Sequence, residues 1–357
     1  MYMNHNLAQP LPPNDAGRNP TEEALARLYE GEDLDSAAAQ RLFEALVAGE
    51  LTEPSIAAML ISLRLKGETA EELIGAARAL RSADEYFPRP NYLFADTCGT
   101  GGDGSGSINV STAVALVAAA AGLPVAKHGN RSITSRCGSA DVLEALGAKL
   151  DVSAELSRRS LDETGFCFLF APRYHPGLRH AGPVRRALKV RTIMNILGPC
   201  VNPAEPQVQL LGVADPKLLE PVAQTLGALG LQNALVVHGS GLDEIALHGP
   251  TQAVRLRAGE IQPLIITPED AGIRQAPMNA LKGGGPEENA ERLKSLLSGD
   301  EAGVESDMVA LNAGALLLTA GMADNLKQAT AAARDVLASG AAYQRLLAFV
   351  EVTNDVQ

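Results

Sequence analysis

The sequence predicts an α/β fold, in which a mainly parallel sheet is flanked by helices and a small all-helical domain precedes it. Two observations carry this prediction. Residues 21 to about 85 show only helical spacing of apolar residues, whereas strand-like runs alternate with helices after residue 92. Such alternation is typical of parallel sheets, because each parallel strand needs a crossover before the next strand.

The helical domain is predicted to span residues 21–86, joined by part of 189–206. Helices are expected at 22–29, 37–47, 53–65 and 70–80, where apolar residues recur every three to four positions. Residues that favour helix N-caps precede three of them: Asp35 or Ser36, Thr52 and Thr69. An apolar stripe on these helices serves either internal packing or a dimer contact.

The large domain is predicted to span residues 92–357, after a Pro-rich linker at 87–91. Strands are expected at 93–96, 123–127, 166–170 and 234–238, and helices at 111–121 and 140–146, with Ser139 as the cap of the second. Residues 189–206 are rich in Pro and Asn and indicate a hinge. Residues 307–350 are typical of helices that break at Gly321 and Gly340.

Composition and charge exclude several classes of protein. The chain has 357 residues and a formal net charge of -12, which argues against non-specific nucleic-acid binding. The cysteines lie far apart without a CxxC pair, so neither a zinc site nor a disulfide framework is expected. Residues 1–20 lack the basic start and apolar core of a signal peptide and are expected to be a disordered tail. The apolar run at 113–126 is too short to span a bilayer, so we expect no membrane contact. The separated cysteines indicate a reducing cytoplasm.

A glycine-rich turn between a strand and a long apolar helix is the strongest functional signal. Residues 96–104 read Asp-Thr-Cys-Gly-Thr-Gly-Gly-Asp-Gly, and such a turn exposes backbone N–H groups that can surround a phosphate. Gly99, Gly101 and Gly104 match G-x-G-x-x-G, but a nicotinamide site would need an acidic residue after the next strand. That strand ends in a basic stretch instead, and no Gly-Lys-Ser/Thr follows the turn, so dinucleotide and P-loop sites are both disfavoured.

Polar residues around this turn allow two interpretations. Asp103 would repel a phosphate, so it faces sugar hydroxyls, a metal or its own backbone turn. Asn109, Ser111 and Thr112 either cap the next helix or donate to a phosphate. The basic loop at 127–135 lies between a strand and a helix, and this favours an anion ligand over a solvated loop.

Charged residues elsewhere suggest a metal and an acidic ligand. Asp243 and Glu244 follow a glycine-rich loop after a strand, which suits Mg²⁺ as well as a helix start. Four arginines between residues 174 and 192 indicate a carboxylate ligand; they are Arg179, Arg185, Arg186 and Arg191. A catalytic thiol at Cys137 is disfavoured, because no paired histidine signature accompanies it. The histidines show no metal-binding spacing and are expected in the core or a pocket; they are His175, His180, His238 and His248.

Long ordered strings of these residues resemble the anthranilate phosphoribosyltransferase family of tryptophan biosynthesis over most of the chain. The strings are Gly99-Thr100-Gly101-Gly102-Asp103, Asn109-Val110-Ser111-Thr112, Lys127-His128-Gly129-Asn130-Arg131-Ser132, Gly138-Ser139-Ala140-Asp141, Phe168-Leu169-Phe170-Ala171-Pro172, Pro183-Val184-Arg185-Arg186, Arg191-Thr192, Asn195-Ile196-Leu197-Gly198-Pro199 and Asp243-Glu244. The family's Thr-Phe before the Asn is replaced by Ser107-Ile108, which keeps the hydroxyl and removes an aromatic wall.

The resemblance implies transfer of phosphoribose from phosphoribosyl pyrophosphate (PRPP) to the amine of anthranilate, in a homodimer paired through the helical domains. It implies Mg²⁺, two ions per monomer, held by Ser111, Asp243 and Glu244. It implies anthranilate contacts from Gly99, Asn130 and Arg185. The implied PRPP contacts are Gly99, Gly102, Asp103, Ser107, Asn109, Val110, Ser111, Thr112, Lys127, His128, Gly129, Asn130, Arg131, Ser132, Ile133, Thr134, Ser135 and Ser139.

This chemistry needs positioning and charge neutralisation rather than a covalent nucleophile, and no residue is identified as a general base. Two other functions remain open at this point. One is a pyrimidine nucleoside phosphorylase of related fold, against which the acidic pair and Arg185 argue. The other is a non-catalytic nucleic-acid-binding relative, against which the net charge of -12 argues.

Overall fold

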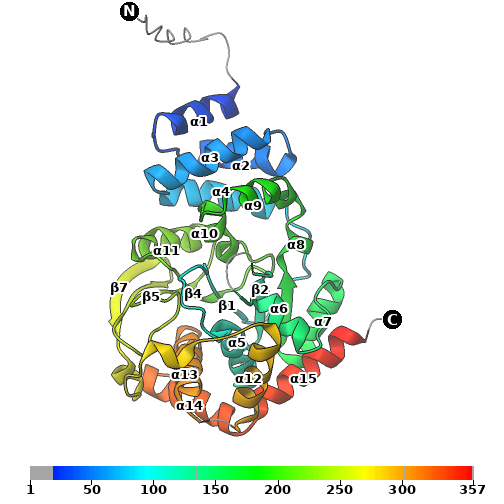
Figure 1. Cartoon of the computed structure of the whole chain (residues 1–357), viewed down its shortest axis with the longest axis vertical. Helices are drawn as coiled ribbons and strands as arrows, with labels where there is room; N and C mark the ends of the chain where they lie inside the picture. Colours follow the sequence, from blue (N-terminus) through cyan, green and yellow to red (C-terminus); the bar gives the residue numbers. More distant parts are fainter. Residues whose placement is uncertain (1–18, 133–135, 301, 356–357) are drawn as a thin grey trace, which may run out of the picture.

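The computed structural model describes residues 19–132, 136–300 and 302–355 (Figure 1). Residues 1–18 of the predicted tail therefore lie outside the described residues, as do Ile133, Thr134 and Ser135 of the predicted PRPP loop. In the described part of the chain, no helix is both long and apolar enough to cross a membrane.

The helical layer forms where the spacing predicts it. Its helices are α1 (Pro20–Tyr29), α2 (Ser36–Ala48), α3 (Glu53–Lys66) and α4 (Ala70–Ser82). The side chains of Asp35, Thr52 and Thr69 accept hydrogen bonds from the first turns of α2, α3 and α4, which confirms the predicted caps. Figure 1 shows this layer stacked above the sheet, farthest from the C-terminus.

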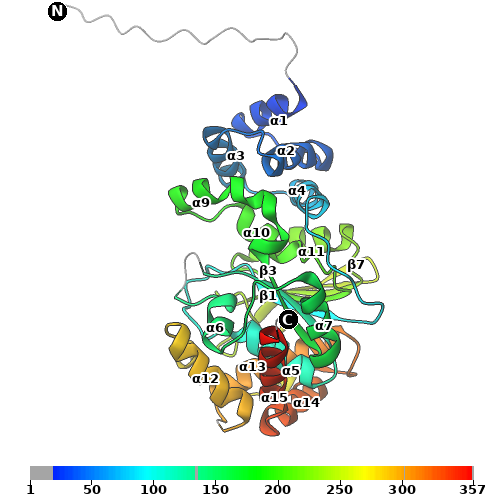
Figure 2. The same cartoon turned by 90° about the vertical axis from the view of Figure 1, so that its right-hand side faces the viewer.

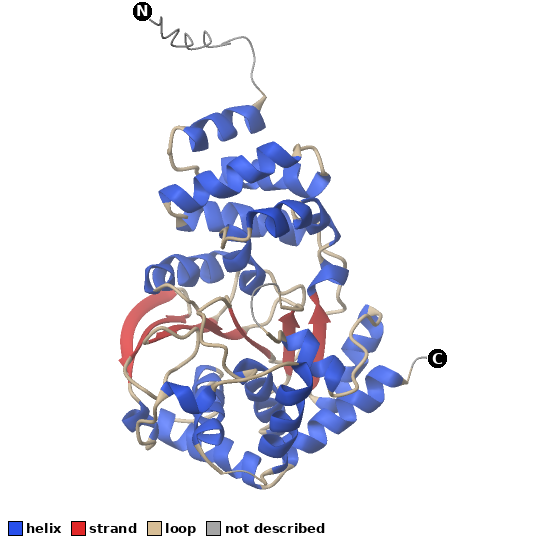
Figure 3. Ribbon diagram, viewed as in Figure 1, coloured by secondary structure: helices blue, strands red, loops and turns tan. Residues whose placement is uncertain are grey.

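The strands of the described residues form one sheet in the order β3-β2-β1-β4-β5-β6-β7. The first five strands along the chain pair in parallel, and β6 and β7 add an antiparallel edge. The strands are β1 (Ala95–Gly99), β2 (Val125–Gly129), β3 (Phe166–Phe170), β4 (Val208–Gly212), β5 (Asn233–Gly239), β6 (Thr251–Arg257) and β7 (Glu260–Ile266). This confirms the predicted α/β class, and Figure 3 shows helices above and below the sheet.

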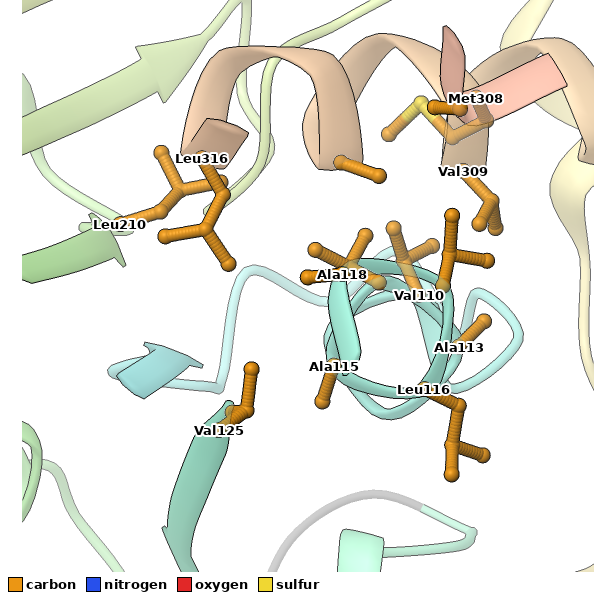
Figure 4. Close-up of a cluster of buried hydrophobic side chains, with 14 of the residues drawn as sticks. Val110, Ala113, Ala115, Leu116, Ala118, Val125, Leu210, Met308, Val309 and Leu316 are labelled. Carbon is orange, nitrogen blue, oxygen red and sulfur yellow. The ribbon is translucent and has the colours of Figure 1, made fainter. Parts of the chain in front are cut away.

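Each face of the sheet packs on its own apolar core. Leu210 faces the lower core and Leu211 the upper one, as the two-residue period of a strand requires. The lower core contains α5 (Val110–Ala120), which is mostly apolar and lies beside β1, β2 and α13; Figure 4 shows its side chains facing α13 and the sheet. The other lower helices are α6 (Ser139–Ala145), α7 (Ala154–Thr164), α12 (Pro286–Ser298), α13 (Val304–Thr319), α14 (Leu326–Ala338) and α15 (Ala341–Asn354).

The upper core joins the sheet to the helical layer through short helices. They are α8 (Ala171–Tyr174), η1 (Pro176–His180), α9 (Gly182–Leu188), α10 (Ile193–Cys200) and α11 (Leu219–Ala228). Helix α9 packs on α3, and α10 packs on α3 and α4, so both lie between the layers in Figure 2. Part of the 189–206 segment thus does meet the helical layer, together with residues just before it.

Several expectations at the level of single elements were wrong. Strand β1 begins at Ala95 rather than residue 93, because Leu93 is exposed and the strand runs on into the glycine turn. Gly138, not Ser139, is the N-cap of α6, because Asp141 accepts the backbone N–H of Gly138. The 189–206 segment is not open coil throughout, since α10 begins there at a Thr192–Asn195 capping box; its role as a hinge stays a prediction.

Candidate active site

A polar cavity of about 350 Å³ lies at the carboxyl ends of β1, β2 and β5, under α10 and the end of α4. In parallel α/β sheets, ligands bind at this edge. Every predicted site residue that the structure describes lines this cavity: Gly99, Gly102, Asp103, Ser107, Asn109, Val110, Ser111, Thr112, Lys127, His128, Gly129, Asn130, Arg131, Ser132, Ser139, Arg185, Asp243 and Glu244.

The acidic pair reaches this cavity because glycines let backbones approach closely. A Cβ on Gly212, at the end of β4, would lie 1.5 Å from the carbonyl oxygen of Asp243. A Cβ on Gly99, at the end of β1, would lie 2.2 Å from Oδ2 of Asp243. The loop after β5 therefore crosses the ends of β4 and β1, which brings Asp243 to the glycine turn, where its Oδ2 accepts the N–H of Gly101 at 2.7 Å.

The carboxyl groups here are half-buried and repel one another. Burial, reinforced by neighbouring Asp103, raises the pKa of Asp243 to about 7. Burial, reinforced by Asp243, raises the pKa of Glu244 well above its usual value, although the backbone N–H of Ser111 donates to it. A cation between Ser111, Asp243 and Glu244 would relieve this repulsion and favour the ionised carboxylates.

The donor set fits a hard cation such as Mg²⁺, which takes carboxylate and hydroxyl oxygens. Across the described ranges, no three His, Cys, Asp or Glu side chains converge as a complete set of metal ligands. A metal at the acidic pair would therefore need further oxygen ligands from water or from a bound phosphate.

Lys127 supplies the buried positive charge of the site. Only 1 % of this residue is exposed, and its Nζ donates to the carbonyl oxygen of Thr97 at 2.6 Å and to Oγ of Ser111 at 3.1 Å. An ammonium group has three N–H donors, so one remains for a ligand oxygen. The Oγ1 of Thr112, one turn into α5, is buried in the cavity wall without a hydrogen-bond partner among the described residues. Both groups fit an anion in the cavity.

Of the roles considered for Asp103, the structure contains the backbone turn. Oδ1 of Asp103 accepts the N–H and the hydroxyl of Ser105 at 3.0 and 2.9 Å, which is an Asx-turn. The same side chain contacts Asp243, so it also belongs to the acidic group at the cavity. Ser107, which keeps the hydroxyl of the family's Thr-Phe pair, lines the cavity. Ile108, which replaces the aromatic residue of that pair, packs into the lower core.

The basic loop after β2 contributes less charge than its sequence suggests. The guanidinium of Arg131 pairs with Glu144 and lies 4.8 Å from the ring centroid of Phe170, so it is already occupied. The carboxylate of Asp141 accepts the N–H groups of Ser132 and Gly138, which ties both residues to the start of α6. The loop therefore offers Asn130 and backbone groups to a ligand, with Lys127 as the main charge.

The arginines gather around a second cavity of about 890 Å³ that shares a wall with the first. Arg179, Arg185, Arg186 and Lys189 line it, and only Arg185 of these four also lines the first cavity. Burial lowers the pKa of Arg185, and its guanidinium has no hydrogen-bond or ion-pair partner among the described residues. Arg191 instead lies against the glycine turn, since a Cβ on Gly102 would be 2.5 Å from its Nε.

Sequence reasoning missed part of the pocket wall. Leu178, Met194 and Pro199 form an apolar side that a flat aromatic ring could contact, beside His175, which was expected in the core or a pocket and lines both cavities. The spacing of these residues gives no signal, and only the fold brings them to the strand ends. Cys137 is no nucleophile candidate, because burial raises the pKa of its thiol.

Comparison with known proteins agrees with this geometry. The model of the glycosyl transferase family a/b domain matches residues 91–343, and that of the family's helical bundle domain matches residues 22–83. The chain is 60% identical to the anthranilate phosphoribosyltransferase of Sorangium cellulosum over 92% of this chain and 94% of that protein. It is 51% identical to that of Yersinia pestis over 92% of this chain and 98% of that protein.

Solved structures show the same likeness. Anthranilate phosphoribosyltransferase from Thermus thermophilus superposes with a TM-score of 0.88 at 46% identity, over 92% of this chain and 99% of that one. The Saccharomyces cerevisiae enzyme in complex with PRPP and Mg superposes with a TM-score of 0.87 at 25% identity, over 94% of this chain and 98% of that one. The chain therefore belongs to the anthranilate phosphoribosyltransferase family.

Proposed function

We propose that this chain transfers the phosphoribosyl group of PRPP to the amine of anthranilate, giving N-(5-phosphoribosyl)anthranilate and pyrophosphate. One observation carries the proposal. A buried lysine, two half-buried carboxyl groups with raised pKa values and an unpaired arginine face a single cavity beside a glycine turn. The lysine and the two carboxyl groups suit a sugar diphosphate bound with a metal. The arginine suits an acceptor that carries a carboxylate.

Ser111, Asp243 and Glu244 would hold Mg²⁺, with two ions per monomer shared with the diphosphate. The metal would neutralise the charge of the departing pyrophosphate. The complex of the yeast relative with PRPP and Mg supports the use of Mg²⁺ together with PRPP.

The chain's own residues act by binding and orientation. Lys127 donates its third N–H to a leaving-group oxygen, and Thr112 donates its hydroxyl beside it. Arg185 binds the anthranilate carboxylate through two parallel hydrogen bonds, and Asn130 and Gly99 complete that side. The ring then lies against Leu178, Met194 and Pro199, with its amine toward the ribose.

The direct test follows the loss of anthranilate fluorescence with purified protein. We expect turnover that requires both PRPP and Mg²⁺, and release of pyrophosphate in equal amount. Cleavage of thymidine by inorganic phosphate, with no loss of anthranilate, would instead support a nucleoside phosphorylase. Retardation of single-stranded DNA at moderate salt, without turnover, would support the nucleic-acid-binding alternative.

We further propose a helical domain at 21–86, a large domain at 92–357 and a cytoplasmic location. We also propose that two copies of the chain pair through their helical domains. Tyr29 and Leu65 support the pairing, because they lie on the adjacent helices α1 and α3 and are 50% and 80% exposed. Sedimentation of the unaltered protein should give a dimer, and Leu65→Glu should give a monomer. A monomeric unaltered protein would contradict the pairing.

The described cysteines are all free thiols, which supports the proposed cytoplasmic location.

A further inference from the structure

Three polar groups with buried side chains form a line from the segment just after α4 to the cavity. Asp84 follows α4, His175 follows α8, and His128 is in β2. Nδ1 of His175 bonds Oδ1 of Asp84, and its Nε2 lies 3.0 Å from Nε2 of His128. Nδ1 of His128 lies 3.1 Å from the carbonyl oxygen of Gly198 in α10. The line therefore runs from the segment after α4 to Gly198 in α10. Both of these segments join the helical layer to the sheet.

The carbonyl at one end fixes the direction of every hydrogen bond in the line. A carbonyl can only accept, so Nδ1 of His128 carries a proton and, in the neutral ring, its Nε2 accepts. Nε2 of His175 must then donate, which leaves one proton between Nδ1 of His175 and Asp84. Burial raises the pKa of Asp84 to about 8 and lowers that of His175 to about 4, which places this proton on the carboxyl group.

Neither ring keeps a nitrogen for the substrate, because all four ring nitrogens already have partners. A proton could pass from a substrate to His128 or His175 only after a hydrogen bond breaks. Both rings nonetheless line the first cavity, and His175 also lines the second. They stand edge to face with centroids 4.9 Å apart. Their role is consequently that of rigid walls where the two cavities meet.

We propose that Asp84 is a positioning residue for the acceptor pocket: its carboxyl group bonds Nδ1 of His175, completes the line that begins at the carbonyl of Gly198, and so holds the rings of His175 and His128 where anthranilate enters. The inference rests on the proposed function for the identity of that acceptor. Asp84 is well placed for this role, because its side chain is only 9% exposed. The linker itself is held separately by the N–H of Glu85, which donates to the carbonyl oxygen of Tyr174 at 2.8 Å.

Two substitutions separate this role from simple packing. In Asp84→Asn the amide N–H can still donate to Nδ1 of His175, so the direction of the line is kept. In Asp84→Ala that nitrogen loses its partner and the ring is free to turn. We expect Asp84→Ala to raise the KM for anthranilate about tenfold, the effect of one lost buried hydrogen bond, while the KM for PRPP stays within about twofold. Asp84→Asn should stay within about threefold of the unaltered protein for both substrates.

The tautomers provide a second readout that needs no variant. Imidazole ¹⁵N NMR of the unaltered protein should show His128 protonated at Nδ1 and His175 at Nε2, and Asp84→Asn should keep this pattern. Reversed tautomers would overturn the proposal, even if Asp84→Ala failed to fold. Equal increases in both KM values, or the same defect in Asp84→Asn as in Asp84→Ala, would also overturn it. If the unaltered protein left anthranilate unchanged, the proposed function would fail. The NMR measurement of the two tautomers would still test the hydrogen-bonded line from Asp84 to Gly198.

Discussion

Replacing Arg185 with Ala removes the group that we assign to the carboxylate of anthranilate. The guanidinium lies on the shared wall of the two cavities and has no partner in the described part of the chain. Its loss therefore leaves no buried carboxylate unpaired, so the free energy of unfolding should change by less than about 0.5 kcal/mol. Two charge-assisted hydrogen bonds in a partly exposed site contribute about 3 kcal/mol, which corresponds to a roughly 150-fold increase in the KM for anthranilate.

The assay is the loss of anthranilate fluorescence, with one substrate varied while the other is saturating. Arg186→Ala is the matched control, because this neighbour is exposed and lines only the second cavity. Arg185→Lys keeps the charge without the planar fork and should lie between Ala and the unaltered protein. Equal increases in the KM values for anthranilate and PRPP, or equal effects of Arg185→Ala and Arg186→Ala, would refute the reasoning.

Three further predictions concern the diphosphate side of the cavity. The double substitution Asp243→Asn with Glu244→Gln should raise the Mg²⁺ concentration for half-maximal rate about tenfold or more, and an unchanged Mg²⁺ titration would remove the metal role. Lys127→Met should weaken PRPP binding about 100-fold in calorimetric titration and lower the thermal midpoint, because the half-buried carboxyl groups lose their counter-charge; unaltered binding would exclude the proposed contact. Gly212→Ala should abolish turnover, since its Cβ would lie 1.5 Å from the Asp243 carbonyl oxygen, while Gly285→Ala, with open space at its Cβ, should be active. An active Gly212→Ala would show that the acidic loop need not cross the end of β4.

The sequence predicted the functional edge of the sheet better than the sheet itself. The glycine turn, Lys127 and the acidic pair could be placed together because the carboxyl ends of parallel strands share one edge. Strand β4 gave no clear signal, because its residues are few, continuously buried and preceded by a Pro-rich stretch. Strands β6 and β7 also went unpredicted, although the burial of β6 largely alternates.

Side-chain partners could not be predicted, because they depend on residues far away in the sequence. Arg131 looks like a phosphate ligand in its motif, yet Glu144 on α6 already binds its guanidinium. Gly212 has no motif of its own, and only the path of the loop after β5 shows why a side chain cannot fit there. His175 reaches the pocket through the packing of α8 between the layers, which local spacing does not encode.

The most direct test of the central claim is a crystal structure of this protein with PRPP and Mg²⁺. We expect the diphosphate within hydrogen-bond distance of Nζ of Lys127, with metal between its oxygens and the carboxylates of Asp243 and Glu244. Density that places the diphosphate in the arginine-lined second cavity, or metal away from both carboxylates, would contradict this claim.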